Sequence, residues 1–501
     1  MLHSQQITEL RRSEKLQEAL DLALIDLDQN PDNLYAKRNI SWVYYGFLKK
    51  FAAENNYSSF IETIEKIIDL NLPQDEHMFF ENLLWPLSSM FRSLAKETPK
   101  NYSNISRLYN LTKVFSFAKP SDKFSILFAA IHKAYKDFHQ YTEVIDEIGL
   151  ESLSAKDFLE EEYNGKRNMA LAEQVYISYA KHLEEGKPVD MYGSNREVDV
   201  EKIRQFMPVL ESLIEKHPEY LYPPYFKAKL LLRLESDDVM SSFLPFARKK
   251  RNEYWVWQLM AEIFKDNPEI VFASYCKALS LKTKDDFLVK IRQNFARILI
   301  QKEKYADAKC EIENILSVKH KTQTRIPNEV QLWLTTEWYH NTVKKVNNFA
   351  LYRDFASEAE EILFSDVPEE TVVVEFVNRD RKILNFVKDQ SKNGFFKYEH
   401  HIQNPQIGDV LKVRFRENPV DGRYMVYTVK QGDSKDSKAL KKVSGTLEII
   451  DLGIGFVDHV LVDASFIKRH DLKNSQQIQG TAILSYNKKK NQWGWKLISI
   501  Q

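Results

Sequence analysis

The sequence predicts a mainly α protein with an all-β C-terminal region, in which an array of helix pairs is followed by two small five-stranded barrels. Amphipathic helical patterns separated by short turn signals fill the N-terminal region. Short apolar strand patterns with Gly-Asp and Asp-Gly turns fill the C-terminal region. Glycine, which is costly inside helices, occurs five times in the first 370 residues and nine times in the last 131. We therefore predict a helical domain at residues 1–365, a first barrel at 366–432 and a second barrel at 440–501.

Composition limits the class of protein. The chain of 501 residues is longer than one ordinary domain, and its hydrophobic fraction of 43% predicts folded structure. Cys276 and Cys310 lie in helical sequence, so we expect two buried, reduced thiols. The N-terminus lacks a charged segment followed by an apolar core, and no apolar run approaches the roughly 18 residues that span a bilayer. We expect a soluble, cytoplasmic protein without membrane contact.

The formal net charge of zero hides an asymmetry between the two regions. Residues 371–501 contain 22 Lys and Arg against 14 Asp and Glu, a net charge of +8, and the preceding residues therefore carry −8. A basic segment on an acidic body indicates a polyanionic partner for that segment. The charge balance gives no such indication for the helical region.

The helical region begins with a helix, a proline-marked turn and a second helix. The first helix covers residues 14–31, and the second begins at about Asn33. The register resembles the tetratricopeptide repeat (TPR), with Ala19 and Ala23 at its small-residue positions and Tyr44 at its aromatic position. Residues 217–251, 254–268 and 294–312 resemble further units, whereas residues 75–200 are helical without a recognisable repeat and include an internal loop at 187–195. The resemblance implies an α-solenoid of TPR-like helix pairs, whose concave groove docks a protein or peptide partner.

Sequence motifs of catalysis are missing from the chain. It has no glycine loop for phosphate, no His-Glu-x-x-His helix and no nucleophile elbow. We therefore expect no enzymatic activity, no cofactor and no metal. One alternative stays open, because scattered carboxylates in residues 75–200 could form a divergent catalytic site.

The last 60 residues resemble a cold-shock domain, a small OB-fold barrel that binds single-stranded nucleic acid by stacking bases on aromatic rings. Gly453-Ile-Gly-Phe-Val resembles the first nucleic-acid-binding motif of that family, and Val460-Leu-Val resembles the second. Ile454 and Leu461 replace two of the family's aromatic residues, and Asp463 replaces its histidine. Of the three positions at which that family usually stacks bases, this sequence keeps an aromatic ring only at Phe456.

The preceding barrel resembles an OB-fold of the cold-shock or S1 type. Strand patterns occur at residues 372–377, 383–387, 394–398, 410–416 and 424–429, and Gly408-Asp409 forms the turn that commonly precedes the fourth strand. The resemblance implies that bases stack on Phe386, Phe396 and Tyr398. The neighbouring Lys382 and Lys397 are expected to contact phosphates.

The hairpin before the C-terminus supplies further candidates. Lys488, Lys489 and Lys490 form a basic turn, which either contacts phosphates or is a solvated hairpin tip. Trp493 and Trp495 are two residues apart on one strand, so their side chains share a face. We expect Trp495 in the barrel core, and Trp493 either in the core or in contact with a base.

These features favour a non-enzymatic adaptor. Its tandem barrels grip single-stranded RNA or DNA, with RNA preferred, and its helical repeats dock a protein partner. The alternative is a protein-interaction scaffold whose barrels no longer bind nucleic acid, as the replaced aromatics of the second barrel suggest. The domain pairing resembles repeat-plus-OB proteins of bacteria, some of which act in conflict or RNA-management systems.

Overall fold

The computed structural model describes residues 3–163, 165–190, 195–399, 401–417, 424–450, 453–487 and 491–501. The chain forms two compact units, Met1–Phe246 and Ala247–Gln501. Each unit has its own architecture and is taken in turn. No helix of the described residues is long and apolar enough to cross a membrane.

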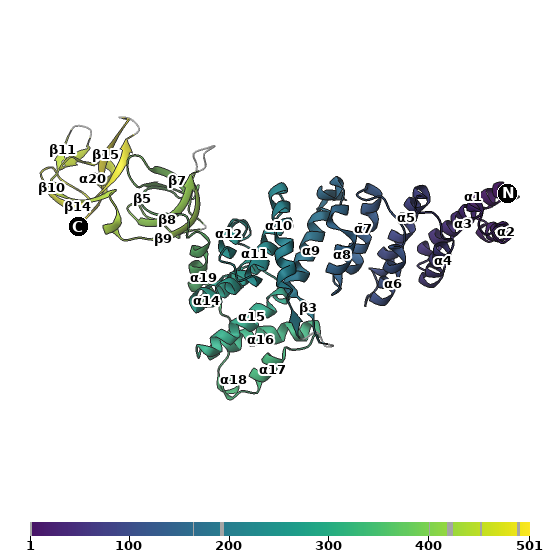
Figure 1. The fold of residues 1–501 in the computed structure, drawn as a ribbon. Coiled ribbons are helices and arrows are strands. Elements are labelled where there is room, and N and C mark those ends of the chain that lie inside the picture. Colours follow the sequence, from purple (N-terminus) through teal and green to yellow (C-terminus); the bar gives the residue numbers. More distant parts are fainter. Residues whose placement is uncertain are drawn as a thin grey trace. The chain divides into compact units, whose positions relative to one another are not determined.

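The first unit is a helical array, as the periodicity predicts. Its helices are α1 (Ser4–Arg12), α2 (Leu16–Gln29), α3 (Leu34–Ala53), α4 (Tyr57–Asp69), α5 (His77–Leu94), α6 (Tyr102–Thr112), α7 (Asp122–Tyr135), α8 (Tyr141–Ile148), α9 (Leu171–Glu185), α10 (Val200–Lys216) and α11 (Pro223–Arg233), with α12 (Val239–Lys249) crossing the boundary. Figure 1 shows successive helices side by side. Ala19 and Ala23 are fully buried in α2, and the Asn33 side chain accepts from the Tyr35 and Ala36 N–H groups at the start of α3. Small residues thus let α2 pack closely, and an Asx cap begins the next helix.

Short non-helical elements interrupt this array. They are the 3-10 turns η1 (Leu150–Ser152) and η2 (Ala155–Phe158) and two hairpins, β1 (Glu161–Tyr163) with β2 (Lys166–Asn168) and β3 (Lys187–Pro188) with β4 (Arg196–Glu197). β3 and β4 border the loop expected at 187–195, whereas the elements η1 to β2 interrupt a stretch that the sequence predicted as helical. Strands of two or three residues are too short to produce a period-2 pattern in the sequence.

The second unit begins with further helix pairs. They are α13 (Tyr254–Ile263), α14 (Pro268–Ser280), α15 (Asp285–Gln301), α16 (Tyr305–Thr322), α17 (Asn328–Leu334), α18 (Glu337–Asn341) and α19 (Phe349–Leu363). Glu311 of α16 is fully buried and accepts from Arg292 Nη1 at 2.7 Å and from Asn348 Nδ2 at 2.6 Å. The Tyr352 hydroxyl donates to the same carboxylate. A buried charge needs such partners, and here they join α15 and α16 to the start of α19, which leads into the strands.

The first barrel is a curled five-stranded sheet. Its strands are β5 (Glu369–Asn378), β6 (Ile383–Val387), β7 (Asn393–Lys397), β8 (Val410–Glu417) and β9 (Tyr424–Gln431), in the order β7-β6-β5-β8-β9. A Cβ atom on Gly394 would lie 2.6 Å from the Tyr424 ring, so only glycine lets edge strand β7 approach β9 this closely. The curled sheet encloses a core of Val372, Val374, Leu384, Phe386, Phe396, Leu411, Val413 and Phe415.

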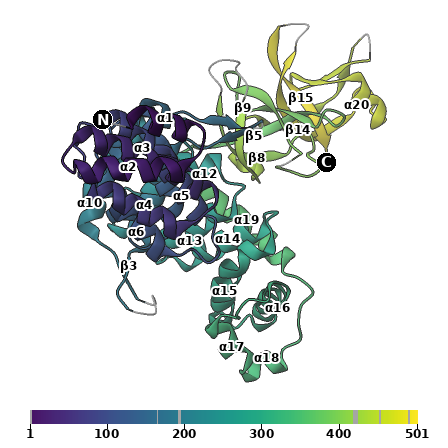
Figure 2. The ribbon, with the colours of Figure 1, turned by 90° about the vertical axis from the view of Figure 1, so that its right-hand side faces the viewer.

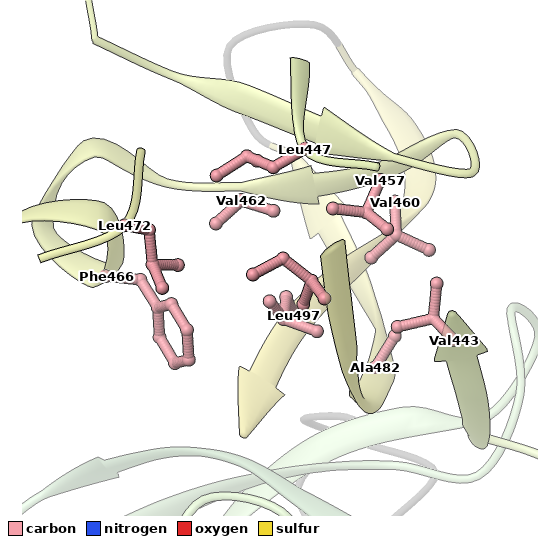
Figure 3. Packing of buried hydrophobic residues seen from close by; sticks show 10 residues of the cluster. Val443, Leu447, Val457, Val460, Val462, Phe466, Leu472, Ala482 and Leu497 are labelled. Atoms are coloured by element: carbon pink, nitrogen blue, oxygen red, sulfur yellow. The ribbon is translucent and has the colours of Figure 1, made fainter. Parts of the chain in front are cut away.

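The second barrel is a six-stranded sheet with one short helix. The strands are β10 (Leu440–Thr446), β11 (Glu448–Ile449), β12 (Gly455–Val457), β13 (Val460–Val462), β14 (Gln477–Asn487) and β15 (Gln492–Ile500), in the order β10-β14-β15-β13-β12-β11, and α20 is Ala464–Arg469. Because β10 and β11 are nearly continuous, they count as one bent strand of a five-stranded barrel. Figure 3 shows the side chains that converge between the strands and α20, among them Leu447, Val462, Phe466 and Leu497.

The two barrels share a third apolar cluster. Val373, Val387 and Val410 of the first barrel pack with Ala439, Ile483 and Leu484 of the second, and Leu440, Trp493, Trp495 and Ile498 line its edge. Figure 2 shows β5 and β14 close together. The predicted fold class, a helical array followed by two small OB-like barrels, is confirmed. The sequence did not indicate that the barrels would be joined.

Candidate nucleic-acid interface

The outer face of β5, β6 and β7 carries a row of three exposed or half-exposed side chains. Phe376 pairs with Asn385, and Asn385 pairs with Phe395, so the three residues lie side by side across the strands. The Phe376 side chain is 53% exposed and the Phe395 side chain 49%. Large apolar side chains seldom gather on an open sheet face without a partner. Two rings flanking an amide form a surface on which bases can stack.

A β-bulge explains why Phe376 faces outward. Val374 lies in the barrel core, and a residue two positions later in a regular strand points to the same face. The register shifts between Val374 and Phe376, which leaves Glu375 as the extra residue. The bulge therefore turns Phe376 to the surface.

Two predicted stacking residues lie on the opposite face. Phe386 is fully buried and Phe396 is 5% exposed, with their ring centroids 5.9 Å apart in the core of the first barrel. The prediction that they stack on bases is wrong, because neither ring reaches the surface. A one-residue slip in register exchanges the two faces of a strand. The polar Asn385 between Leu384 and Phe386 was the signal that Phe386 points inward, and sequence reasoning missed Phe376 and Phe395.

The structure brings Lys382 and Tyr398 together at one end of the first barrel. Both line a cavity of about 430 Å³, together with Arg379, Glu399, Ile402 and Asn404. Lys382 Nζ lies 2.8 Å from Glu399 Oε2, and this hydrogen bond raises the pKa of the Lys382 ammonium. The Tyr398 ring is half-buried against the barrel core. Lys382 is therefore already partly neutralised, and Tyr398 contributes more to packing than to an open surface.

Lys397 lies on the face of the exposed Phe395 and not on that of the buried Phe396. It is exposed at the end of β7, two residues after Phe395 and on the same face. Among the described residues, no carboxylate lies within ion-pair distance of its ammonium group. An exposed cation on the same face as two exposed rings is well placed to meet a phosphate.

The corresponding face of the second barrel is poorer in rings. Phe456 is half-buried, and its neighbours across the strands are Glu448 and Leu461, with Lys496 beside Leu461. Lys496 Nζ lies 2.6 Å from Asp463 Oδ2. Among the residues described on this face, Phe456 is the one ring, and Lys496 already has a partner.

Asp463, which replaces the family's histidine, has a structural role. Its carboxylate accepts from the Phe466 N–H and the Ser465 hydroxyl, and so caps α20. Partial burial alone would raise the pKa of Asp463. The hydrogen bonds from Lys496, Ser465 and the Phe466 N–H outweigh that effect and lower the pKa to about 2.

The remaining candidates lie in the C-terminal hairpin. Trp493 is half-buried against the apolar cluster between the barrels, and its ring centroid lies 5.3 Å from that of Tyr486. Trp495 packs against both this cluster and the core of the second barrel. Lys488, Lys489 and Lys490 lie outside the described residues. Within the part of the chain that the structure describes, no group of three or more His, Cys, Asp or Glu side chains could hold a metal ion.

Comparison with protein families agrees with these two barrels. Residues 364–427 match the family described as S1/CSD-like domain 1 of the TOTE conflict systems, and residues 441–500 match S1/CSD-like domain 2 of the same systems. The two barrels are S1/CSD-like domains. Residues 221–359 match a domain of unknown function (DUF7017), and no curated protein matches the chain. The expected resemblance is confirmed, and with it a fold suited to nucleic-acid binding.

Proposed function

We propose that the protein is a non-enzymatic adaptor whose S1/CSD-like domains bind single-stranded RNA or DNA. The observation that carries this proposal is the row of Phe376, Asn385 and Phe395 on the outer face of the first domain. Base stacking on an aromatic side chain contributes about 1–3 kcal/mol and tolerates any base. Two exposed rings therefore support binding without strong sequence preference.

The charges around this row support a modest salt dependence. Lys388 Nζ lies 3.0 Å from Glu370, Lys392 pairs with the same carboxylate, and Lys382 pairs with Glu399. Each of these cations is partly neutralised within the domain, whereas Lys397 has no ion pair with any residue that the structure describes. We expect few phosphate contacts and hence a shallow fall of affinity with salt.

The helical repeats take a protein or peptide partner in this proposal. A groove of about 920 Å³ lies among α8, α9 and α10 of the first unit, where Leu153, Phe158 and Tyr176 provide apolar contacts. Asp146, Glu151 and Lys216 also line the groove. An apolar floor with a few charged groups suits a short peptide segment.

A titration of the full-length protein tests the nucleic-acid part of this proposal. Fluorescence anisotropy of labelled 12-nucleotide RNA and DNA would be recorded at two salt concentrations. Phe376→Ala and Phe395→Ala should each weaken binding about tenfold. Phe287→Ala is the matched control, because Phe287 is a similarly exposed phenylalanine on α15, at 59% exposure, outside both barrels.

The alternative is a protein-interaction scaffold, and the ring-poor face of the second barrel favours it. In that case the wild-type protein would bind neither RNA nor DNA at low salt. Equal affinities of the wild type and both phenylalanine variants would instead place nucleic acid elsewhere on the molecule.

A further inference from the structure

The apolar cluster between the barrels makes them one body. It joins three valines of the first barrel to Ala439, Ile483 and Leu484 of the second, and every one of these residues is at most 8% exposed. Gly408 adds a close approach, because a Cβ atom there would lie 2.6 Å from Ile498 Cδ1. A buried, closely packed apolar contact of this kind holds two small domains in a fixed orientation.

A polar contact lies at the edge of the same junction. Ser485 Oγ donates to Glu375 Oε1 at 2.6 Å, and the Tyr486 N–H donates to the same oxygen at 3.2 Å. Glu375 is the extra residue of the β5 bulge. One local irregularity therefore turns the Phe376 ring outward and directs the preceding carboxylate to the second barrel.

An exposed ring of the second barrel lies beside that contact. Tyr486 of β14 is 37% exposed and pairs across the hairpin with Trp493 of β15. Their ring centroids are 5.3 Å apart, and Trp493 packs against the junction cluster. The Tyr486 hydroxyl also donates to the Asn491 side chain. The ring is thus held on one side by a tryptophan that is itself anchored.

We propose that Tyr486, supported by Trp493, is an additional base-stacking position between the two barrels, so that one continuous strand passes from the row on the first barrel onto the second. Phe376 follows Glu375 directly in the chain, and the Tyr486 N–H is hydrogen-bonded to Glu375. Phe376 of the first barrel and Tyr486 of the second barrel therefore lie on either side of the contact that Glu375 makes. This inference rests on the proposed function and names the path of the strand.

A continuous path has a consequence for ligand length. A strand held at two linked places gains affinity because its second contact is made at high effective concentration, provided that the strand is long enough to reach both. We expect a 4-nucleotide strand to cover the phenylalanine row alone and a 12-nucleotide strand to cover the row and the junction. The rigid junction keeps the two places at a constant separation.

The experiment compares these two lengths on the full-length protein. Oligouridylates of 4 and 12 nucleotides would be titrated into the wild type, Tyr486→Ala and Tyr486→Phe. We expect Tyr486→Ala to weaken binding of the 12-nucleotide strand about tenfold and that of the 4-nucleotide strand less than twofold. Tyr486→Phe keeps the ring and should retain wild-type affinity for both strands.

A second measurement uses the wild-type protein and needs no substitution at the junction. A 12-nucleotide strand with 5-iodouracil at each position in turn would be photo-crosslinked to the wild type, and the modified residues identified by mass spectrometry. We expect crosslinks to Phe376 or Phe395 from one part of the strand and to Tyr486 from another.

The possible results distinguish the continuous path from the proposed function on which it rests. If Tyr486→Ala leaves the 12-nucleotide strand unaffected, or weakens both lengths equally, the continuous path is wrong while nucleic-acid binding stands. Crosslinks confined to the first barrel would overturn it as well. If the wild type binds neither strand, the proposed function itself is wrong.

Discussion

The two barrels have similar folds but differ in what their outer faces carry. The first presents Phe376 and Phe395 with Lys397, which has no ion pair among the described residues, whereas the second presents Phe456 with Leu461 beside it. In the second barrel, Asp463 caps a helix and pairs with the lysine of that face. The face of the first barrel thus keeps two exposed rings for a ligand, whereas charged residues on the face of the second barrel stabilise its own fold. Under the proposed function, we expect the first barrel to provide most of the binding energy.

The largest effect should come from the core of the first barrel. Phe386→Ala removes a fully buried ring and should destabilise that barrel by about 3–5 kcal/mol, whereas the exposed Phe395→Ala should cost less than about 1 kcal/mol. Hydrogen exchange of peptides from β5 to β9 measures both. Equal losses of stability for the two substitutions would contradict the assignment of Phe386 to the buried face and Phe395 to the exposed face.

The next largest effect concerns binding. The double variant Phe376→Ala/Phe395→Ala should weaken binding of a 12-nucleotide strand about a hundredfold, since two stacked rings are lost. Phe456→Ala removes a half-buried ring from a poorer face and should weaken binding about threefold or less. Anisotropy titrations give both ratios. A larger loss for Phe456→Ala would reverse the comparison between the barrels.

A smaller effect tests the structural role of Asp463. Its pKa in the folded state, about 2, lies below the ordinary value of 3.8, so its stabilisation is present above about pH 4 and is lost as the pH falls towards 2. Asp463→Asn should lower the protection of α20 amides by about 1 kcal/mol at pH 6, after allowance for partial exposure, and by much less at pH 2.5. Hydrogen exchange at both values checks this, and a pH-independent loss would contradict a role for the ionised carboxylate, because asparagine caps a helix about as well as aspartate.

The smallest effect concerns the unpaired lysine. Lys397→Gln should weaken binding about threefold at low salt and reduce the slope of log affinity against log salt by about 0.7, as expected for one phosphate contact on a single strand. Lys382→Gln is the matched control, because the Lys382 ammonium is already paired with Glu399. Identical slopes for the wild type and both variants would exclude a phosphate contact at Lys397.

The fold was predictable because its signals are periodic and local. Amphipathic repeats marked helices such as α2 and α15, and glycine turns marked the barrels. The exposed face of the first barrel was misassigned because period-2 reasoning depends on register, and the bulge at Glu375 is not visible in a run of apolar residues. Asn385 alone could have indicated which neighbours face outward.

The junction between the barrels was not predictable from the sequence. Glu375 and Ser485 meet across 110 residues, and no local pattern specifies such a partner. Trp493 could have faced either way on the strand. It packs at the junction because Val373, Val387 and Val410 of the other barrel cover that side of the hairpin.

The central claim is that single-stranded nucleic acid binds the outer face of β5, β6 and β7. Hydrogen exchange of the full-length wild type, with and without a saturating 12-nucleotide strand, tests this most directly. We predict added protection in peptides covering residues 371–398 and 484–495, with no change in helices α1 to α11. Protection confined to the helical array, or absent from the β5–β7 peptides when the strand is bound, would contradict the claim.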